Sequence, residues 1–491
     1  MAKRTRREIL AEPPPAPPAV NALPAEMVER TYTIQLVTPM FGGGVVAGHP
    51  DDRFPVRPTA IRGHLRFWWR VTCGHRYPLT AACRPGQVDR RQREEEIWGS
   101  TETPSAVQVE IAADRLSEVG FRWRAEPGCD PRQTEFGFRK YGALSYALFP
   151  ARPEPGEQTG RRRIDRIVRE SLSFRLKLTF PTESRLTEIR QREIGRLGKQ
   201  GVKADQLPLG RVADISAEVD AALNAWLTFG GLGARTRRGL GAIRAQPSAN
   251  ITVPVGAVLL ITETGFDDPL EALWQALDIY QWFRQKQYRN DGRRGERMGR
   301  SRWPEPDSLR AITGCHAFFA EGGTTVDHRQ ATVPAGTGLP CFPKAVLGLP
   351  IVFKFVDGLT KAEEYDMEKD PPRGTLSAHI ADHPRTGEPV GDRMASPVII
   401  RPIWSTESGK FVPGFLFLPA HRALALRAYL SFERALPGQT GSTLVPNDQI
   451  TGHRVARFEP THRSMNAIEA LKQYVRNAYQ SQMLGVLELR G

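Results

Sequence analysis

The first half of the chain changes between strand-like and helix-like patterns of apolar residues. Apolar and polar positions alternate over 31–38, which predicts a strand. A helix is expected to begin at Pro58, because proline suits a first helical turn, and to run to about Thr72. We predict further strands at 106–112 and 172–180, a second helix at 216–229, and a Gly-rich segment after it. The resulting order of strand, helix, strand, strand, helix and strand is the ferredoxin-like pattern.

The second half repeats a similar order with weaker signals. Its predicted strands are 253–262, 345–355, 396–404, 411–418 and 484–489, and its predicted helices are 268–287 and 466–480. Residues 357–392 are polar, contain Gly and Pro, and are expected to form a long loop. We interpret this half as a second, more divergent copy of the first unit. The expected organisation is a disordered Pro-rich tail over 1–27, one domain over 28–248 and a second over 249–491.

The charge of the chain is strongly basic and unevenly distributed. The formal net charge is +14, from 68 basic and 54 acidic residues, and 56 of the basic residues are Arg. Up to position 250 there are 40 basic and 28 acidic residues, so nearly all of the excess lies in the first half. A polyanion is the natural partner of such a surface, and the planar guanidinium suits phosphates and bases. A GC-rich genome would also explain much of the Arg excess, but not its asymmetry.

The cysteines and the apolar runs limit the cellular context. The five Cys residues form no CxxC pair, so neither a disulfide framework nor a zinc ribbon is indicated, and we expect no metal or cofactor. The basic N-terminus lacks the apolar core of a signal peptide, and the run over 251–262 is too short to span a bilayer. We therefore expect a cytoplasmic protein.

The predicted helix over 58–72 combines an apolar stripe with a row of Arg residues. At 100° per residue, Ile61, Leu65, Trp68 and Thr72 share one face, with Trp69 at its boundary. A row of three Arg lies beside that stripe, namely Arg62, Arg66 and Arg70. A Trp flanked by guanidinium groups suits single-stranded nucleic acid, because the ring stacks on a base and the charges hold phosphates. The alternative is a core helix with a solvated charged face.

Two Gly-rich segments and one Arg-rich segment are further candidates. The stretch 230–241 has five Gly and three Arg, and its glycines allow a phosphate to approach the backbone closely. It is neither a Walker loop nor a dinucleotide fingerprint, and it could be a plain helix-ending turn. The turn over 42–49 is also Gly-rich. The segment 289–303 could clamp nucleic acid or be a solvated insertion.

Catalytic motifs are absent from the sequence. It contains no HExxH, GxSxG, kinase or P-loop pattern. His49 and His64 lie in the basic half and could act as acid or base in metal-independent RNA cleavage. Single His residues are more often structural or binding groups.

The Gly-rich stretch resembles the C-terminal Gly-rich loop of the RAMP superfamily, the ferredoxin-like RNA-binding proteins of CRISPR systems. Its matching residues are Gly231-Leu232-Gly233 and Arg238-Gly239-Leu240-Gly241. Four other stretches are similar to the family of first subunits of type III-B Cmr effector complexes: 38–43, the R-P-T-x-I-R-G-x-L-R-x-W-W-R run over 57–70, 299–304, and 393–397. The run over 57–70 is the more specific signal.

This resemblance implies an α+β fold with tandem ferredoxin-like (RRM-like) domains and a non-catalytic RNA-binding subunit without a cofactor. The implied partners are the 3′ region of the guide RNA, the incoming single-stranded target RNA and other Cmr subunits, with no membrane. The rivals are a guide-processing endoribonuclease and a protein-only scaffold. Loop insertions are expected near 126–163, 184–210 and 357–392. The implied RNA-binding residues are Arg57, Arg62, His64, Arg66, Trp69, Arg70, Arg235, Arg237, Arg238, Arg293, Arg294, Arg297, Arg300 and Arg302, and the glycines of close backbone approach are Gly42, Gly43, Gly231, Gly233, Gly239 and Gly241.

Overall fold

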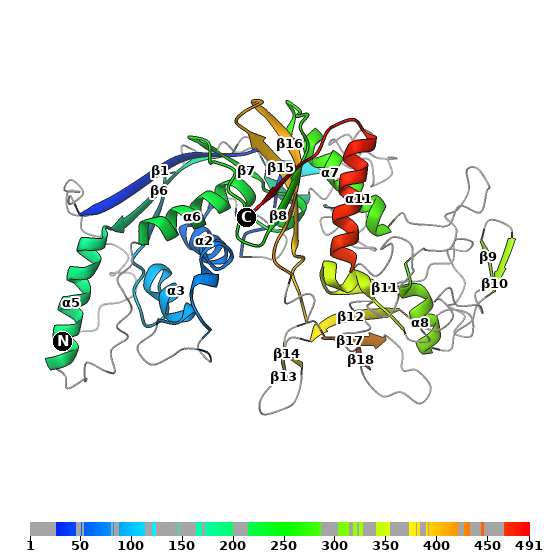
Figure 1. Cartoon of the computed structure of the whole chain (residues 1–491), viewed down its shortest axis with the longest axis horizontal. Helices are drawn as coiled ribbons and strands as arrows, with labels where there is room; N and C mark the ends of the chain where they lie inside the picture. Colours follow the sequence, from blue (N-terminus) through cyan, green and yellow to red (C-terminus); the bar gives the residue numbers. More distant parts are fainter. Residues whose placement is uncertain are drawn as a thin grey trace, which may run out of the picture.

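The structure is a computed structural model of the whole chain. It describes residues 26–45, 51, 54–79, 82, 88–112, 120–123, 147, 164–168, 172–199, 215–285, 303–313, 318–321, 324–327, 340–353, 373–379, 381–382, 389–390, 392–420, 427–432, 443–445 and 466–491. Helices and antiparallel sheets are mixed along these residues, as expected for the α+β class (Figure 1).

The first unit is a four-stranded antiparallel sheet with two helices on one face (Figure 1). Its strands follow the order β3-β6-β1-β7 across the sheet. Register places Ile34 of β1 opposite Phe174 of β6 and Ala245 of β7. Two helices pack on each other above these strands and share one apolar cluster with them. The elements are β1 (Met27–Leu36), α2 (Pro58–Thr72), β3 (Gln108–Ala112), β6 (Ser173–Pro181), α6 (Ile215–Phe229) and β7 (Ile243–Gln246).

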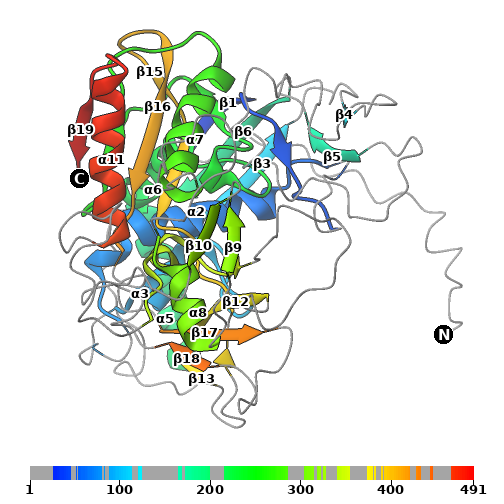
Figure 2. The same cartoon turned by 90° about the vertical axis from the view of Figure 1, so that its right-hand side faces the viewer.

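The second unit has the same sequence of elements around its own sheet, and two helices that lie side by side in both views (Figure 2). The strands follow the order β15-β16-β8-β19, and every neighbouring pair is antiparallel. Asn466 caps the last helix, because its Oδ1 accepts from the N–H groups of Ile468 and Glu469. The elements are β8 (Val258–Ile261), α7 (Pro269–Gln285), β15 (Val398–Ser405), β16 (Lys410–Phe417), α11 (Ala467–Ser481) and β19 (Leu487–Arg490).

Smaller elements surround these two units. A third antiparallel sheet has the order β11-β12-β17-β18. The remaining elements are β2 (Met40–Phe41), α3 (Arg90–Trp98), β4 (Gly120–Trp123), β5 (Ile164–Val168), α5 (Glu183–Lys199), α8 (Glu305–Thr313), β9 (Phe318–Glu321), β10 (Thr324–Asp327), β11 (Ile351–Phe353), β12 (Gly374–His379), β13 (Ala381–Asp382), β14 (Pro389–Val390), β17 (Arg427–Phe432) and β18 (Thr443–Val445), with 3₁₀ turns η1 (Gly74–Arg76), η5 (Thr236–Arg238) and η6 (Pro343–Leu347).

The second sheet is buried on both faces, and this joins the two units. Successive strand residues point to opposite sides of a sheet. Leu259 and Ile399 face the cluster of the first unit, whereas Leu260 and Ile400 face the cluster under α7 and α11. The two apolar clusters therefore meet across one shared sheet. The domain boundary at 248/249 stays a prediction, since the core of the first unit extends beyond it.

Most predicted elements are confirmed, and three predictions are wrong. The helix over 58–72 has the predicted bounds. The strand expected from 345 begins only at Ile351, because η6 occupies 343–347. The predicted long loop over 357–392 contains β12, β13 and β14. Residues 183–199 are helical rather than a loop insertion. The expected tail over 1–27 lies outside the described residues except for its last two residues, and Met27 begins β1. The insertion around 126–163 lies largely outside the described residues.

Candidate nucleic-acid interface

Helix α2 carries most of the predicted RNA-binding residues. Pro58 occupies its first turn, and Arg57 precedes it in an extended conformation. Its apolar stripe is buried against the first sheet and α6, as predicted for Ile61, Leu65 and Trp68. The helix is therefore fixed along its whole length, and its remaining side chains point in defined directions toward α3, the Gly-rich loop or solvent.

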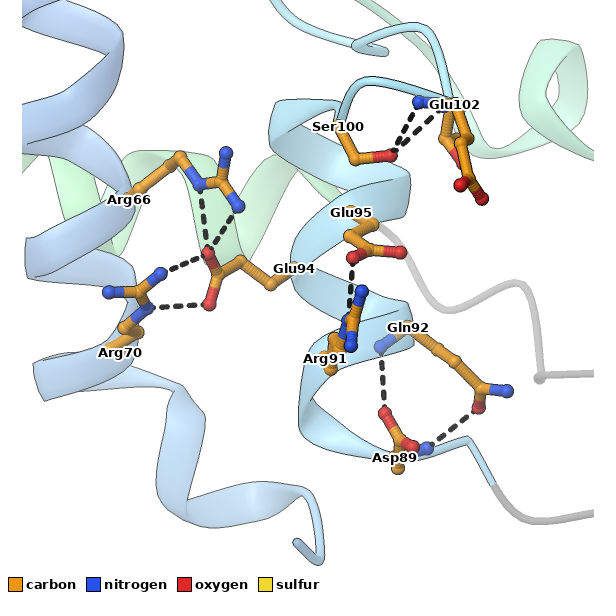
Figure 3. A network of polar contacts seen from close by, with 10 residues as sticks. Arg66, Arg70, Asp89, Arg91, Gln92, Glu94, Glu95, Ser100 and Glu102 are labelled. Carbon is orange, nitrogen blue, oxygen red and sulfur yellow. Dashed lines mark hydrogen bonds and ion pairs between the residues drawn. The ribbon is translucent and has the colours of Figure 1, made fainter. Parts of the chain in front are cut away.

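The Arg row of α2 has an acidic partner on a neighbouring helix. Glu94 of α3 lies between Arg66 and Arg70 (Figure 3). Arg66 Nε donates to Glu94 Oε1 at 2.8 Å, and Arg70 donates through Nε to Oε2 at 2.6 Å and through Nη2 to Oε1 at 2.5 Å. Burial alone would raise the pKa of Glu94, but the hydrogen bonds from Arg70 and Arg66 outweigh it and lower the pKa. These three side chains thus hold α2 and α3 together.

A capping box positions α3 for these contacts (Figure 3). Asp89 Oδ1 accepts from the Gln92 N–H at 2.7 Å, and Gln92 Oε1 accepts from the Asp89 N–H at 3.1 Å. This reciprocal pair caps the start of the helix at Arg90, four residues before Glu94. The Asp-x-x-Gln spacing is a sequence signal for this helix, which the pattern of apolar residues alone did not predict. No signal along the sequence pairs Glu94 with Arg66, 28 positions earlier.

Trp69 does not face solvent, so the prediction that it stacks on a base is wrong. Its side chain is fully buried, and its Nε1 donates to Glu218 Oε2 of α6 at 2.6 Å. The same carboxylate accepts from the Tyr77 hydroxyl at 2.7 Å and from Arg93 Nη2 at 2.8 Å. Arg93 and Glu218 are both almost fully buried. Trp69 is therefore part of a polar network inside the core, which joins α2, α3 and α6.

Two Arg residues at the start of α2 remain candidates for phosphate contact. Arg57 Nη2 donates to the Gly43 carbonyl at 2.8 Å, which fixes the Gly-rich turn after β2 to the helix start. The Nε atom of Arg62 is buried without a hydrogen-bond partner among the described residues. Both side chains are partly exposed. Arg62 has a donor that the rest of the described protein does not satisfy.

The Gly-rich loop packs against the protein itself. Gly233 has φ +76°, and a Cβ there would lie 2.6 Å from the Phe41 carbonyl oxygen. A Cβ at Gly241 would lie 1.9 Å from the Leu232 carbonyl oxygen. Gly42 and Gly43 belong to the turn that meets this loop, with Gly43 against Gly233. The glycines therefore allow close approach between protein segments: Gly231 approaches Gly241 and Gly239 approaches α7. Close approach of a phosphate to this backbone stays a prediction.

The three Arg residues of this loop have different environments. Arg238 is buried, donates to the Val398 carbonyl at 3.1 Å and to the Tyr280 hydroxyl at 2.9 Å, and stacks on that ring. Its predicted RNA contact is wrong, since it joins the loop to the second unit. Arg237 lies 5.2 Å above the Phe67 ring and donates to the Ser396 carbonyl. Burial and the neighbouring Arg238 lower the pKa of Arg237 to about 10, so it remains charged at neutral pH. Arg235 has a left-handed φ of 61° and is partly exposed.

The structure divides the predicted site between two sides of α2. Arg66 and Arg70 face α3, whereas His64 faces α6 and lies 6.3 Å from the Trp226 ring. Burial lowers the pKa of His64, so its imidazole is neutral at pH 7. The predicted clamp residues Arg293, Arg294, Arg297, Arg300 and Arg302, and the candidate His49, lie outside the described residues.

No group of three or more His, Cys, Asp or Glu side chains in the described part of the chain could hold a metal ion. None of the helices described is both long and apolar enough to cross a membrane.

Comparison with known proteins gives one family and a set of similar structures. Residues 33–244 match the model of the RAMP superfamily, which confirms the resemblance seen in the Gly-rich loop. No curated protein matches the sequence. The matched segment begins within β1 and ends within β7, so it contains most of the first unit, including α2 and the Gly-rich loop.

Three solved structures are similar over most of the chain at low identity. Cmr1 from Pyrococcus furiosus in its apo form has a TM-score of 0.40 and 13% identity, covering 95% of this chain and 99% of that one. A chain of type III-B Cmr-beta bound to cognate target RNA has a TM-score of 0.39 and 11% identity, covering 92% and 100%. A chain of Cmr-beta with target RNA and AMPPnP, in the presence of ssDNA, has a TM-score of 0.35 and 12% identity, covering 83% and 96%.

Proposed function

We propose that the protein is an RNA-binding subunit of a type III-B CRISPR (Cmr) effector complex, from the premise that residues 33–244 match the model of the RAMP superfamily. The observation that carries this proposal is the juxtaposition of α2, with its R-P-T-x-I-R-G-x-L-R-x-W-W-R sequence, and the Gly-rich loop in the matched segment. The basic excess of the first half supports a polyanionic ligand.

We further propose that the two units are tandem ferredoxin-like domains. In each sheet, the first strand lies between the third and fourth strands of its unit, and the second strand lies at the edge. A helix follows the first strand and another follows the third. This order supports the β-α-β-β-α-β pattern predicted from the sequence. The first unit would provide the RNA-binding side.

The proposed role is binding without catalysis. The partners would be the 3′ region of the guide RNA, the incoming target RNA and neighbouring Cmr subunits. Four partly exposed Arg residues lie directly before α2, on α2 or on the Gly-rich loop and are our candidates for phosphate contact: Arg57, Arg62, Arg235 and Arg237. Glu94 neutralises part of the positive charge of Arg66 and Arg70, and the remaining charge would attract the RNA. Arg70 is the more exposed of these two side chains.

Salt-dependent RNA binding by charge-reversed variants tests the proposal. Arg62→Glu should weaken binding of a labelled single-stranded RNA and reduce the slope of log affinity against log salt by about 0.7. Arg196→Glu on the exposed end of α5 makes the same change of charge and serves as the control. Fluorescence anisotropy between 50 and 200 mM salt measures both. Equal behaviour of the two variants, or no RNA binding by the parent chain, contradicts the proposed interface.

The complex itself is tested in the native host. The tagged chain should co-purify small RNAs that share one repeat-derived 5′ tag, together with other subunits. Random fragments, or no RNA, would contradict membership of a CRISPR effector. Incubation of the pure chain with repeat RNA in the absence of metal tests the non-catalytic role, since a single site-specific cut would instead support the endoribonuclease rival.

A further inference from the structure

A small pocket lies where α2, α6, the Gly-rich loop and β15 meet. Its volume is about 180 Å³, below the range of roughly 300–1,000 Å³ that is typical of sites for drug-sized ligands. Trp68, Trp226, Phe229 and Ile399 form its buried part. Because Ile399 belongs to the second unit, the pocket requires both units. The pocket therefore has room for a small chemical group but not for a drug-sized ligand or a peptide.

The mouth of the pocket is partly exposed and cationic. Phe67 and Arg237 line it together, with the Arg237 guanidinium stacked on the Phe67 ring. Arg237 uses one of its five N–H groups on the Ser396 carbonyl. His64 and Thr236 complete the partly exposed lining. An aromatic ring beside a guanidinium is the surface on which unstacked nucleobases pack in proteins that bind single strands.

Two residues that line the pocket each have a polar atom without a partner. Trp226 Nε1 and His64 Nδ1 are both buried and make no hydrogen bond with the described residues. Buried polar atoms without partners are uncommon and indicate a missing water, ion or ligand group. An indole N–H can only donate, whereas a neutral imidazole nitrogen donates or accepts according to its tautomer. The residues that line the pocket thus have unused hydrogen-bonding groups as well as flat apolar surfaces.

We propose that this pocket receives one unstacked nucleobase of the bound RNA, with the base packed on the Phe67–Arg237 rim and its edge read by Trp226 and His64. The inference rests on the proposed function and identifies the chemical group that the site takes. Donors at Trp226 and Arg237 favour a base that presents carbonyl and ring-nitrogen acceptors on one edge, as guanine does with O6 and N7. Adenine presents an amino donor in place of that oxygen.

Binding of RNAs with defined base content tests the pocket. The probes are three labelled 12-nucleotide uridine strands that carry guanine, adenine or an abasic sugar at every third position. The full chain should bind the guanine strand several-fold more tightly than the adenine strand. It should bind the guanine strand at least about tenfold more tightly than the abasic strand. Repeating the changed position along each strand makes the result independent of the register in which the strand binds.

Substitutions in the pocket complete the test. Phe67→Ala removes part of the rim, and His64→Leu removes the imidazole while keeping its bulk. Each should remove the preference for the guanine strand over the adenine strand. Trp282→Ala, at an exposed aromatic residue of α7, is the control and should keep the preference. Thermal melting by circular dichroism checks that each variant is folded.

The outcomes separate the two proposals. If the parent chain binds none of the three strands, both the proposed function and the pocket are wrong. If it binds all three strands equally, with the usual salt dependence, RNA binding holds and the pocket assignment is overturned. If the guanine preference survives in both Phe67→Ala and His64→Leu, the base is read elsewhere on the protein, which also overturns the assignment.

Discussion

The buried carboxylate of Glu218 should be one of the most sensitive single positions in the first unit. It accepts four hydrogen bonds, from Trp69 Nε1, the Tyr77 hydroxyl, and Nε and Nη2 of Arg93, over distances of 2.6–3.0 Å. Glu218→Gln keeps the shape of the side chain but removes its charge. One of its two oxygens becomes an amide NH2 group, which donates hydrogen bonds but does not accept them. This group would face side chains that also donate.

The cost follows from the burial of both charges. Removing one partner of a buried ion pair costs about 3–5 kcal/mol, because the other charge stays buried without compensation. Arg93 retains a second carboxylate, Glu96, on a partly exposed side, so the lower part of that range is expected. A loss of about 3 kcal/mol should lower the urea midpoint of the first unit by about 1 M or more. Far-UV circular dichroism during urea titration measures this midpoint.

Glu95→Gln is the matched control on α3. Glu95 pairs with Arg91, whose side chain is 80% exposed, in an i,i+4 arrangement on the helix surface. Such surface pairs contribute about 0.3–0.5 kcal/mol, so the midpoint should hardly move. If Glu218→Gln unfolds at the same urea concentration as Glu95→Gln, the buried network does not hold the three helices together and the reasoning fails.

Two further predictions concern glycines and pH. Gly63→Ala should stabilise the protein by about 0.5–1 kcal/mol, because a Cβ there meets nothing within 4 Å in the middle of α2. Gly241→Ala should lower the free energy of unfolding by more than about 1–2 kcal/mol, because a left-handed φ adds to the overlap of its Cβ with Leu232. Urea titration compares the two glycine variants, and equal midpoints would refute the prediction. Burial, and then the bond to Glu218, raises the pKa of Tyr77 to about 12. The unfolded chain releases this proton at a lower pH than the folded chain, so the free energy of unfolding should fall as pH rises from about 10 to 12. Urea midpoints measured at pH 9.5–11.5 should decline less steeply in Tyr77→Phe than in the parent chain. An unchanged slope would contradict the assignment.

The elements were predictable where one chain segment contains the whole signal. Pro58 and the 100° apolar stripe fix α2 within the sequence itself, so its bounds were correct. The run over 345–347 is short and apolar, and such a run does not distinguish a strand from a tight helical turn. It forms part of η6, whose buried side chains pack under α11.

The site was less predictable because its partners are distant in sequence. Trp69 lies at the edge of the apolar stripe, where a helical wheel leaves its exposure undecided. Its burial depends on Glu218, 149 positions later, and on the closely packed Tyr77 ring. Likewise, the charge on Arg66 and Arg70 is balanced by a residue of another helix, Glu94. Composition shows how many charges a segment has, but only tertiary structure shows which of them are already paired.

The second unit determines which face of the Gly-rich loop a ligand can reach. Arg401 of β15 is buried, and it donates to the carbonyls of Gly230 and Ile243 at the two ends of the loop. Arg238 donates in the opposite direction, from the loop to Val398 of the same strand. These bonds occupy the inner face of the loop. A strand of RNA would therefore approach from the side of Arg235 and Arg237.

This arrangement also determines which charge reversal is informative. Replacing Arg62, Arg66 and Arg70 together by Glu would place two new carboxylates beside Glu94, whose side chain is 8% exposed. Like charges at that separation repel, and the loss of both donors leaves a buried carboxylate unpaired. The triple variant should unfold the contact between α2 and α3, so its loss of RNA binding would not identify an interface. Arg62→Glu removes no hydrogen bond to a described residue, and a loss of affinity in a variant with unchanged thermal melting would therefore report on RNA.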